Sequence, residues 1–149
     1  MYNNRVNLFT RPFFMQLPPG SIIASGPVII EDGKVLLNRE KKPIGQELFM
    51  FPGGTVKDFS VSLEANCQRE TKEEVGIEIK IIKPLRTILW QRPEDKIYII
   101  LVHYLAKRLS EVKPGADTLE WNWFDIKNLP TNCAPNVYEI INDYLKETV

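Results

Sequence analysis

The residues best suited to chemistry are four charged side chains close together in the chain: Arg69, Glu70, Glu73 and Glu74. On an expected helix, Glu70 and Glu74 fall beside Leu63, at the rim of the core-facing stripe. Like charges at these spacings repel by roughly a few tenths of a kcal/mol per pair, and carboxylates in a last helical turn oppose the helix dipole. One arginine cannot neutralise three carboxylates, whereas a hard divalent cation, Mg²⁺ or Mn²⁺, can.

The helix that carries these residues is expected to end at Gly76. Glycine is the usual left-handed cap, and the β-branched residues within 77–82 favour a strand. The predicted core-facing stripe consists of Leu63, Cys67, Thr71 and Val75. A glutamate-rich helix end could also be a solvated acidic patch, and helix geometry alone leaves both interpretations open.

Two consecutive glycines, Gly53 and Gly54, precede the helix. Because they lack a Cβ atom, their backbone N–H groups can closely approach a phosphate or a metal-bound water. A Gly-Gly turn alone indicates little. Joined to the acidic helix, it predicts a phosphate-binding site.

The two motifs together, Pro52-Gly53-Gly54 and Arg69-Glu70-x-x-Glu73-Glu74-x-Gly76-Ile77, resemble the Nudix box, G-x5-E-x7-R-E-U-x-E-E-x-G-U, where U is a bulky apolar residue. The resemblance implies hydrolysis of a diphosphate linkage in a nucleoside diphosphate joined to another group, such as ADP-ribose, or in a nucleoside triphosphate. It implies Mg²⁺ or Mn²⁺ as cofactor. The implied metal ligands are Glu70, Glu73 and Glu74. Arg69 would hold their geometry, and Glu73 or a glutamate from a later loop would be the general base.

The match departs from the pattern in the loop after the glycines. Val61 stands where the first glutamate belongs, Thr55 stands where the first glycine belongs, and the loop is one residue longer. In the family that glutamate mostly supports the loop and the arginine, so the metal site is expected to survive, with Glu64 as a candidate substitute. The altered loop also motivates two alternatives: a nucleotide-binding regulatory module without hydrolysis, and a plain interaction domain.

Further candidate residues follow from the same resemblance. The run 21–40, with Asp32-Gly33 at its centre, has the signature of a β-hairpin and resembles the first hairpin of the Nudix fold. Arg39, at its end, would face substrate phosphates, although a surface arginine is equally consistent. Asp117 and Glu120 are candidates for an additional carboxylate. Pro93 lies after Ile77 at about the distance that is typical of Nudix enzymes cleaving ADP-ribose, and it also suits an ordinary turn.

The predicted fold is an α/β/α sandwich with a mixed, curved sheet. The glycine turn and its helix cover one side, and a C-terminal helix opening at Ala134-Pro135 covers the other. Its expected core stripe comprises Val137, Ile140, Ile141, Tyr144 and Leu145. Residues 1–149 are expected to form one domain, with 1–20 as an N-terminal arm or strand. His103, without a second histidine or a cysteine nearby, is predicted to be structural.

The composition of the chain limits the classes of molecule that it is expected to bind. The 149 residues carry 19 basic and 19 acidic side chains, so no net positive charge favours a polymeric nucleic acid. No segment has the length or apolarity of a signal peptide or a membrane span, which excludes a membrane partner. Two cysteines have neither disulfide nor metal-ligand spacing, which indicates reduced thiols in the cytoplasm. The expected partner is a small nucleotide substrate, and the family makes a homodimer an open possibility.

Overall fold

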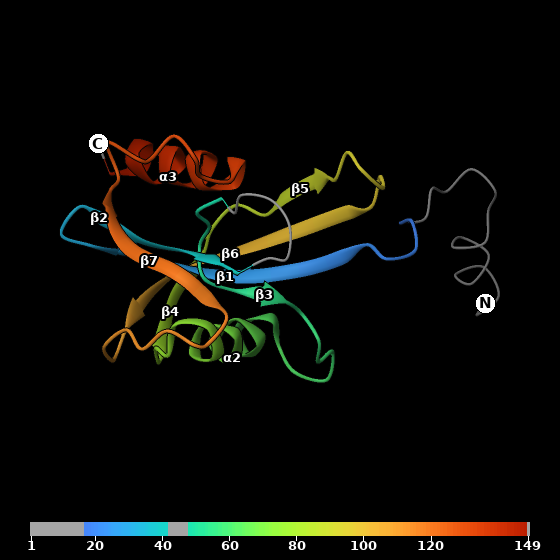
Figure 1. The fold of residues 1–149 in the computed structure, drawn as a ribbon, viewed down its shortest axis with the longest axis horizontal. Coiled ribbons are helices and arrows are strands. Elements are labelled where there is room, and N and C mark those ends of the chain that lie inside the picture. Colours follow the sequence, from blue (N-terminus) through green and yellow to red (C-terminus); the bar gives the residue numbers. More distant parts are fainter. Residues whose placement is uncertain (1–16, 42–47, 149) are drawn as a thin grey trace, which may run out of the picture.

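The computed structural model describes residues 17–41 and 48–148. Its elements, in chain order, are β1 (Ile22–Glu31), β2 (Lys34–Glu40), β3 (Gly54–Thr55), α2 (Leu63–Val75), β4 (Ile79–Pro84), β5 (Ile88–Gln91), β6 (Tyr98–Arg108), β7 (Thr118–Asp125) and α3 (Pro135–Glu147). The strands form a single sheet, and the two helices cover its opposite faces (Figure 1). The predicted α/β/α sandwich is confirmed.

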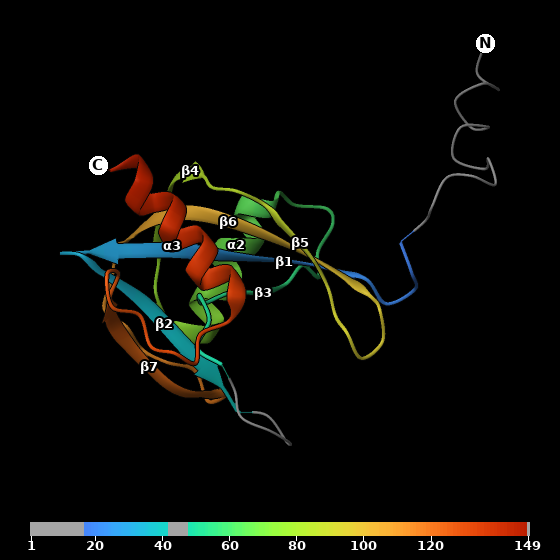
Figure 2. The same cartoon turned by 90° about the horizontal axis from the view of Figure 1, so that it is seen from above.

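The first two strands form the predicted hairpin and then separate. Asp32 (φ 49°) and Gly33 (φ 74°) both adopt the left-handed conformation that a tight hairpin turn requires. β1 and β2 pair only next to this turn. Farther from the turn, β1 pairs with β3, whereas β2 pairs with β7 along its whole length. Figure 2 shows β2 and β7 diverging from β1. The chain enters the resulting opening at Met50, whose backbone exchanges two hydrogen bonds with that of Asn38.

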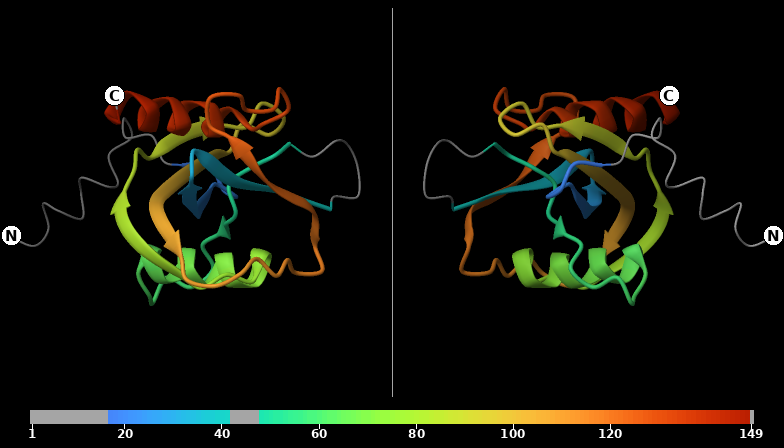
Figure 3. Two further views of the ribbon diagram at one scale, coloured as in Figure 1. Left: turned by 90° about the vertical axis from the view of Figure 1, so that its left-hand side faces the viewer. Right: turned by 90° about the vertical axis from the view of Figure 1, so that its right-hand side faces the viewer.

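The centre of the sheet is the parallel pair of β1 and β6, in register from Ile22 opposite Ile99 to Ile29 opposite Ala106. β4 and β5 both lie antiparallel along β6, and the strand order is β4-β6-β1-β2-β7. Parallel and antiparallel pairs are therefore mixed. Viewed end-on, the sheet is strongly curved between α3 and α2 (Figure 3).

Alternation along the two hairpin strands divides the core into two layers. Val28 and Val35 belong to the layer under α3, whereas Ile29 and Leu36 belong to the layer under α2. The predicted stripe of α3 is confirmed, with Val137, Ile140 and Ile141 buried and Tyr144 and Leu145 packed against them. The predicted stripe of α2 is also confirmed, with Cys67, Thr71 and Val75 buried and Leu63 partly buried.

Some expectations concern segments that the structure does not describe or places differently. Residues 1–16 of the predicted arm and residues 42–47 lie outside the described ranges. The connection that carries Asp117 begins only after Arg108, because β6 continues to that residue, which pairs with β4 and forms an ion pair with Glu31. Among the described residues, no helix combines the length and apolarity needed to cross a membrane.

Candidate active site

The loop that leads into α2 is supported by polar side chains of the helix itself. Ser62 is the N-cap, and the side chain of Asn66 donates hydrogen bonds to the carbonyl oxygens of Asp58 (2.9 Å) and Ser62 (3.0 Å). The side-chain oxygen of Asn66 accepts from Arg69 at 3.4 Å. Asn66 thus connects the loop to Arg69, which is the supporting role that the family pattern gives to its first glutamate.

The two residues considered for that glutamate do not take this role. Val61 is 46% exposed. Burial and the nearby Glu64 carboxylate both raise the pKa of Tyr104 on β6, so Glu64 is directed toward the sheet and away from the loop. Sequence reasoning missed Asn66, whose signal was a polar residue next to the apolar stripe.

The glycine turn crosses directly over β1. Gly53 has a φ of 139°, and a Cβ atom there would collide with the carbonyl oxygen of Ser25. A Cβ atom on Gly26 would likewise collide with the carbonyl oxygen of Pro52. Both crossing positions therefore require glycine. Gly26 was not predicted as a site residue, although a glycine inside an apolar strand indicates close backbone approach.

Gly54 makes room for a buried carboxylate. A Cβ atom on Gly54 would lie 2.9 Å from the carboxyl carbon of Glu70, and Glu70 is only 8% exposed. Oε1 of Glu70 lies 2.9 Å from Nη2 of Arg69 as an ion pair but accepts no hydrogen bond from the described residues. Ser25 stands opposite Gly54 in the strand register, and its buried hydroxyl also lacks a hydrogen-bond partner in this part of the chain.

Glu74 is held by two donors. Its Oε2 accepts from the backbone N–H of Gly53 at 2.9 Å, and its Oε1 accepts from the side-chain amide of Asn38. Burial raises the pKa of Glu74 to about 8, because the two hydrogen bonds only partly offset the desolvation and the neighbouring carboxylate of Glu40 adds to it. Neither Asn38 nor Glu40 was predicted; the polar side chain in the apolar run VLLN was the available signal.

Arg69 joins the other two glutamates. Its Nη1 lies 3.1 Å from both carboxylate oxygens of Glu73, as the i,i+4 spacing of the two residues on a helix allows. The same guanidinium forms the ion pair with Glu70. Glu73 is the more exposed partner, with 56% of its side chain accessible. Arg69 therefore fixes the separation between a buried and an exposed carboxylate.

Arg39 lies at the end of β2 and is oriented by two contacts. Its Nε donates to Oε2 of Glu120 on β7 at 2.8 Å, and its guanidinium lies 5.0 Å from the centre of the Phe49 ring. Glu120, proposed as a catalytic carboxylate, is thus paired with Arg39 in this structure. Of Asp117, the structure shows a backbone carbonyl that accepts from the N–H of Lys41 at 2.9 Å.

The glutamates fit a divalent cation in their chemistry but are not yet gathered around one point. Within residues 17–41 and 48–148, no three His, Cys, Asp or Glu side chains lie close enough together to hold a metal ion. Glu70 and Glu74 lie against the glycine turn, whereas Glu73 turns to Arg69. Carboxylate oxygens are the hard donors that Mg²⁺ prefers, and a buried carboxylate oxygen that accepts no hydrogen bond from the described residues, such as Oε1 of Glu70, suits a cation ligand.

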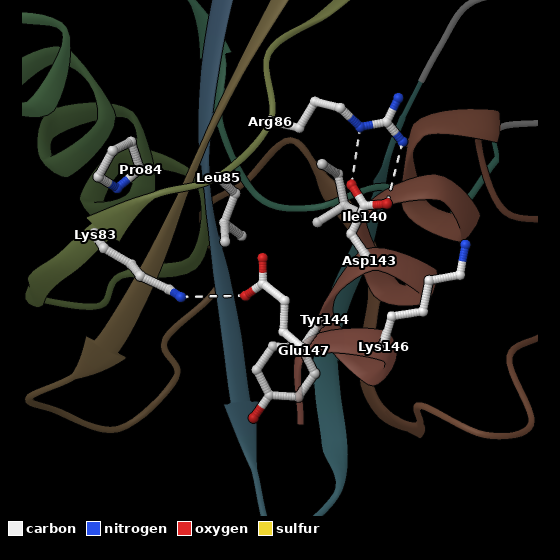
Figure 4. Close-up of a pocket in the computed structure, with 9 residues that line it drawn as sticks. All are labelled: Lys83, Pro84, Leu85, Arg86, Ile140, Asp143, Tyr144, Lys146 and Glu147. Carbon is white, nitrogen blue, oxygen red and sulfur yellow. Dashed lines mark hydrogen bonds and ion pairs between the residues drawn. The ribbon is translucent and has the colours of Figure 1, made fainter. Parts of the chain in front are cut away.

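A separate cavity lies away from these residues. A cavity of about 360 Å³ between the β4–β5 connection and α3 is lined by Lys83, Pro84, Leu85, Arg86, Ile140, Asp143, Tyr144, Lys146 and Glu147. Figure 4 shows it spanned by two ion pairs, Arg86 with Asp143 and Lys83 with Glu147. None of the predicted site residues lines it.

His103 is structural, as predicted. It is 3% exposed; Nδ1 lies 3.0 Å from the carbonyl oxygen of Arg86, and Nε2 lies 3.0 Å from the amide of Asn136. Burial lowers the pKa of His103, which keeps the ring neutral. A neutral ring that donates from Nδ1 and accepts at Nε2 satisfies both contacts.

Known proteins resemble this chain in sequence and in fold. The NUDIX domain family model matches residues 22–144. An ADP-ribose pyrophosphatase of Methanocaldococcus jannaschii is 30% identical over 83% of this chain and 73% of its own length. An 8-oxo-dGTP diphosphatase of Buchnera aphidicola is 33% identical over 80% of this chain and 89% of its own length.

Solved structures agree on the fold. A NUDIX hydrolase from Nitrosomonas europaea superimposes with a TM-score of 0.76 at 20% identity, covering 85% of this chain and 90% of that chain. A MutT protein from Methanosarcina mazei also gives a TM-score of 0.76, at 19% identity, over 91% of this chain and 99% of that chain. These solved structures show the fold, whereas the family match over residues 22–144 and the two relatives in sequence show that the chain belongs to the NUDIX family and is a pyrophosphohydrolase.

Proposed function

We propose that this chain hydrolyses a diphosphate linkage in a nucleoside diphosphate joined to another group, with Mg²⁺ or Mn²⁺ as cofactor. The observation that best supports this is the packing of Glu70 and Glu74 against the turn of Gly53 and Gly54. The acidic helix end thereby meets a stretch of backbone without side chains, which a diphosphate can approach closely.

Glu70, Glu73 and Glu74 are the residues that would hold the cation. When bound, the cation supplies charge neutralisation of the diphosphate and lowers the pKa of a coordinated water. Arg69 fixes the relative positions of Glu70 and Glu73 through its contacts with both. Glu73 is the proposed general base, because it is the exposed member of the pair and can exchange a proton with water.

Arg39 is the proposed phosphate-binding side chain. A guanidinium binds phosphate oxygens with two parallel hydrogen bonds, and the cation–π contact with Phe49 helps to keep it at this position. The carboxylate of Glu120 occupies that hydrogen-bonding edge here, so a substrate phosphate would exchange with Glu120. Glu120 is the second candidate for the general base, and its release from Arg39 would free it for that role.

The substrate is the part that a screen must identify. The printed names of the two relatives, an ADP-ribose pyrophosphatase and an 8-oxo-dGTP diphosphatase, define the first two compounds to test. Nucleotide sugars, dinucleoside polyphosphates and unmodified nucleoside triphosphates complete the set. Wild type is compared with Glu73→Gln and Glu74→Gln at excess Mg²⁺. Glu78→Gln is the matched control, since Glu78 follows α2 but pairs with Lys72.

The expected result is turnover of one substrate class by wild type and by Glu78→Gln, with a loss of about 100-fold or more in the two site variants. If no compound turns over while Mg²⁺ or a nucleotide raises the melting temperature, a nucleotide-binding module without hydrolysis replaces the proposal. If neither binds, the plain interaction domain is the remaining reading.

Three further statements accompany this proposal as predictions. One domain over residues 1–149 predicts a single cooperative unfolding transition. A cytoplasmic location is supported by Cys67 and Cys133, which are both unpaired and buried. A homodimer is tested by light scattering, in which the mass of the particle is compared with the 17.2 kDa of the chain.

A further inference from the structure

Asn38 is a polar residue at a buried strand position, where an apolar side chain is usual. It follows the buried run Val35, Leu36 and Leu37 on β2 and is itself only 1% exposed. Its backbone N–H and carbonyl are both used in hydrogen bonds with Met50, so its side chain has no role in pairing the strand.

The side chain of Asn38 instead reaches the acidic end of α2. Its Nδ2 donates to Oε1 of Glu74, while its Oδ1 has no hydrogen-bond partner among the described residues. Both atoms are bonded to the same carbon, so the unpartnered oxygen must also lie beside Glu74. The backbone N–H of Gly53 occupies the other oxygen of this carboxylate.

Stability alone does not explain an asparagine here. A buried acceptor without a hydrogen-bond partner lowers the stability of the fold, and a leucine of similar size would avoid that loss. The arrangement becomes useful if a ligand is added, because the two donors fix the orientation of the Glu74 carboxylate and Oδ1 remains as a hard oxygen.

We propose that Asn38 is a positioning residue for cation binding: it orients the Glu74 carboxylate and adds an uncharged oxygen acceptor at the same place. This inference rests on the proposed function, since it assumes that Glu74 takes a divalent cation. It adds a strand residue outside the helix to the groups that determine the affinity for the metal.

The test measures Mn²⁺ binding to the whole chain by calorimetry, without substrate, together with the melting temperature. Asn38→Leu preserves the size of the side chain and removes both polar atoms. Asn38→Ser is a second variant, since its small hydroxyl leaves room for water if leucine disturbs the fold. Asn136→Leu is the control: it removes a side-chain amide that bonds to His103 on the opposite face.

The expected result is that both Asn38 variants remain folded and bind Mn²⁺ about 10–100-fold more weakly, whereas Asn136→Leu binds it like wild type. Activity of the Asn38 variants should require correspondingly more Mg²⁺ and recover at saturating metal. Unchanged Mn²⁺ affinity in folded Asn38 variants, beside a wild type that binds Mn²⁺, overturns this inference alone. A wild type that binds no Mn²⁺ overturns the metal-dependent function and this inference together.

Discussion

Buried polar side chains on the two faces of the sheet differ in how completely they are hydrogen-bonded. On the α3 face, His103 is enclosed with a partner for each ring nitrogen, the carbonyl of Arg86 and the amide of Asn136. On the α2 face, Asn38 is equally buried, but one of its polar atoms has no partner in the described chain. It lies beside Glu74, a carboxylate whose burial raises its pKa.

This difference distinguishes a structural network from the proposed binding site. A satisfied buried network rigidifies a core, whereas a partly satisfied one lowers stability unless something else completes it. Within the described ranges, three of the four buried side-chain atoms that lack a hydrogen-bond partner, Ser25 Oγ, Asn38 Oδ1 and Glu70 Oε1, belong to residues around the glycine turn. Of these, Glu70 Oε1 has only its ion pair with Arg69. The α2 face is therefore expected to gain stability and order when its ligand binds, and the α3 face is not.

The largest loss of activity is expected from Gly54→Ala. The added methyl group would collide with the Glu70 carboxylate, the movable end of a side chain, so the fold can adjust while Glu70 shifts. A displacement of about 1 Å at a reacting group can reduce the rate about 100-fold. We expect that loss in kcat/KM with a nearly unchanged melting temperature.

Gly33→Ala is the matched control for this variant. This variant makes the same glycine-to-alanine change at a position where nothing lies within 4 Å of the added Cβ. The backbone φ of 74° at Gly33 makes the change strained. It should lower stability by about 1–2 kcal/mol and leave kcat/KM unchanged. Equal activity losses in the two variants would show that Gly54 acts through the fold and not through Glu70.

The second prediction concerns the pH dependence of stability on the α2 face. The pKa of Glu74 is raised to about 8 in the folded chain from an ordinary value of 4.5, so the folded state holds this proton more tightly than the unfolded state. Its contribution is constant below about pH 4.5 and is lost as the pH rises toward 8, at up to about 1.4 kcal/mol per pH unit.

Unfolding by urea at several pH values checks this sign. Glu74→Gln should remove the fall in stability between pH 5 and 8 and be more stable than wild type at pH 8 without metal, although it should be inactive. Mg²⁺ should flatten the wild-type slope, because a cation favours the ionised carboxylate. If the stability of wild type and of Glu74→Gln changed equally between pH 5 and 8, the raised pKa would not belong to Glu74.

The third prediction is the opposite slope on the α3 face. Burial lowers the pKa of His103 below its ordinary 6.5, so stability falls as the pH drops through about 6.5 and the unfolded state gains a proton first. His103→Leu should remove this slope and cost about 1–3 kcal/mol, because Asn136 and the Arg86 carbonyl lose their partner. The activity of the folded variant should not change. A large drop in kcat would show that His103, on the α3 face, contributes to the reaction at the α2 face.

Much of the fold could be predicted from the sequence, because the strongest sequence patterns depend on residues that are close together in the chain. The turn at Asp32 and Gly33, the stop at Gly76 and the stripe of α3 depend on neighbouring residues in one segment, and all were confirmed. The pairing of Arg69 with Glu73 also follows from helix spacing alone.

The unpredicted part of the site depends on contacts between segments. Asn38 and Glu74 are 36 positions apart, and Gly26 meets Pro52 only because the glycine turn crosses β1. No periodicity within a single element encodes such a crossing. The partnership of Arg39 with Glu120, separated by 81 positions, was missed for the same reason, although both residues were singled out.

The smallest effect is expected from Glu120→Gln, which tests the boundary of the α2 site. The pair with Arg39 is partly exposed, with 27% and 44% of the two side chains accessible, so its loss should change stability by less than about 1 kcal/mol. If Glu120 only occupies Arg39 until a phosphate displaces it, the neutral variant binds substrate more readily. KM should then fall by about a few-fold while kcat is unchanged, because only ground-state binding is altered. Glu111→Gln, which changes an exposed carboxylate that lies on the connection between β6 and β7 and pairs with Arg108, is the control and should match wild type. A loss of about 100-fold in kcat for Glu120→Gln would instead identify Glu120 as the general base and assign Glu73 to metal binding alone.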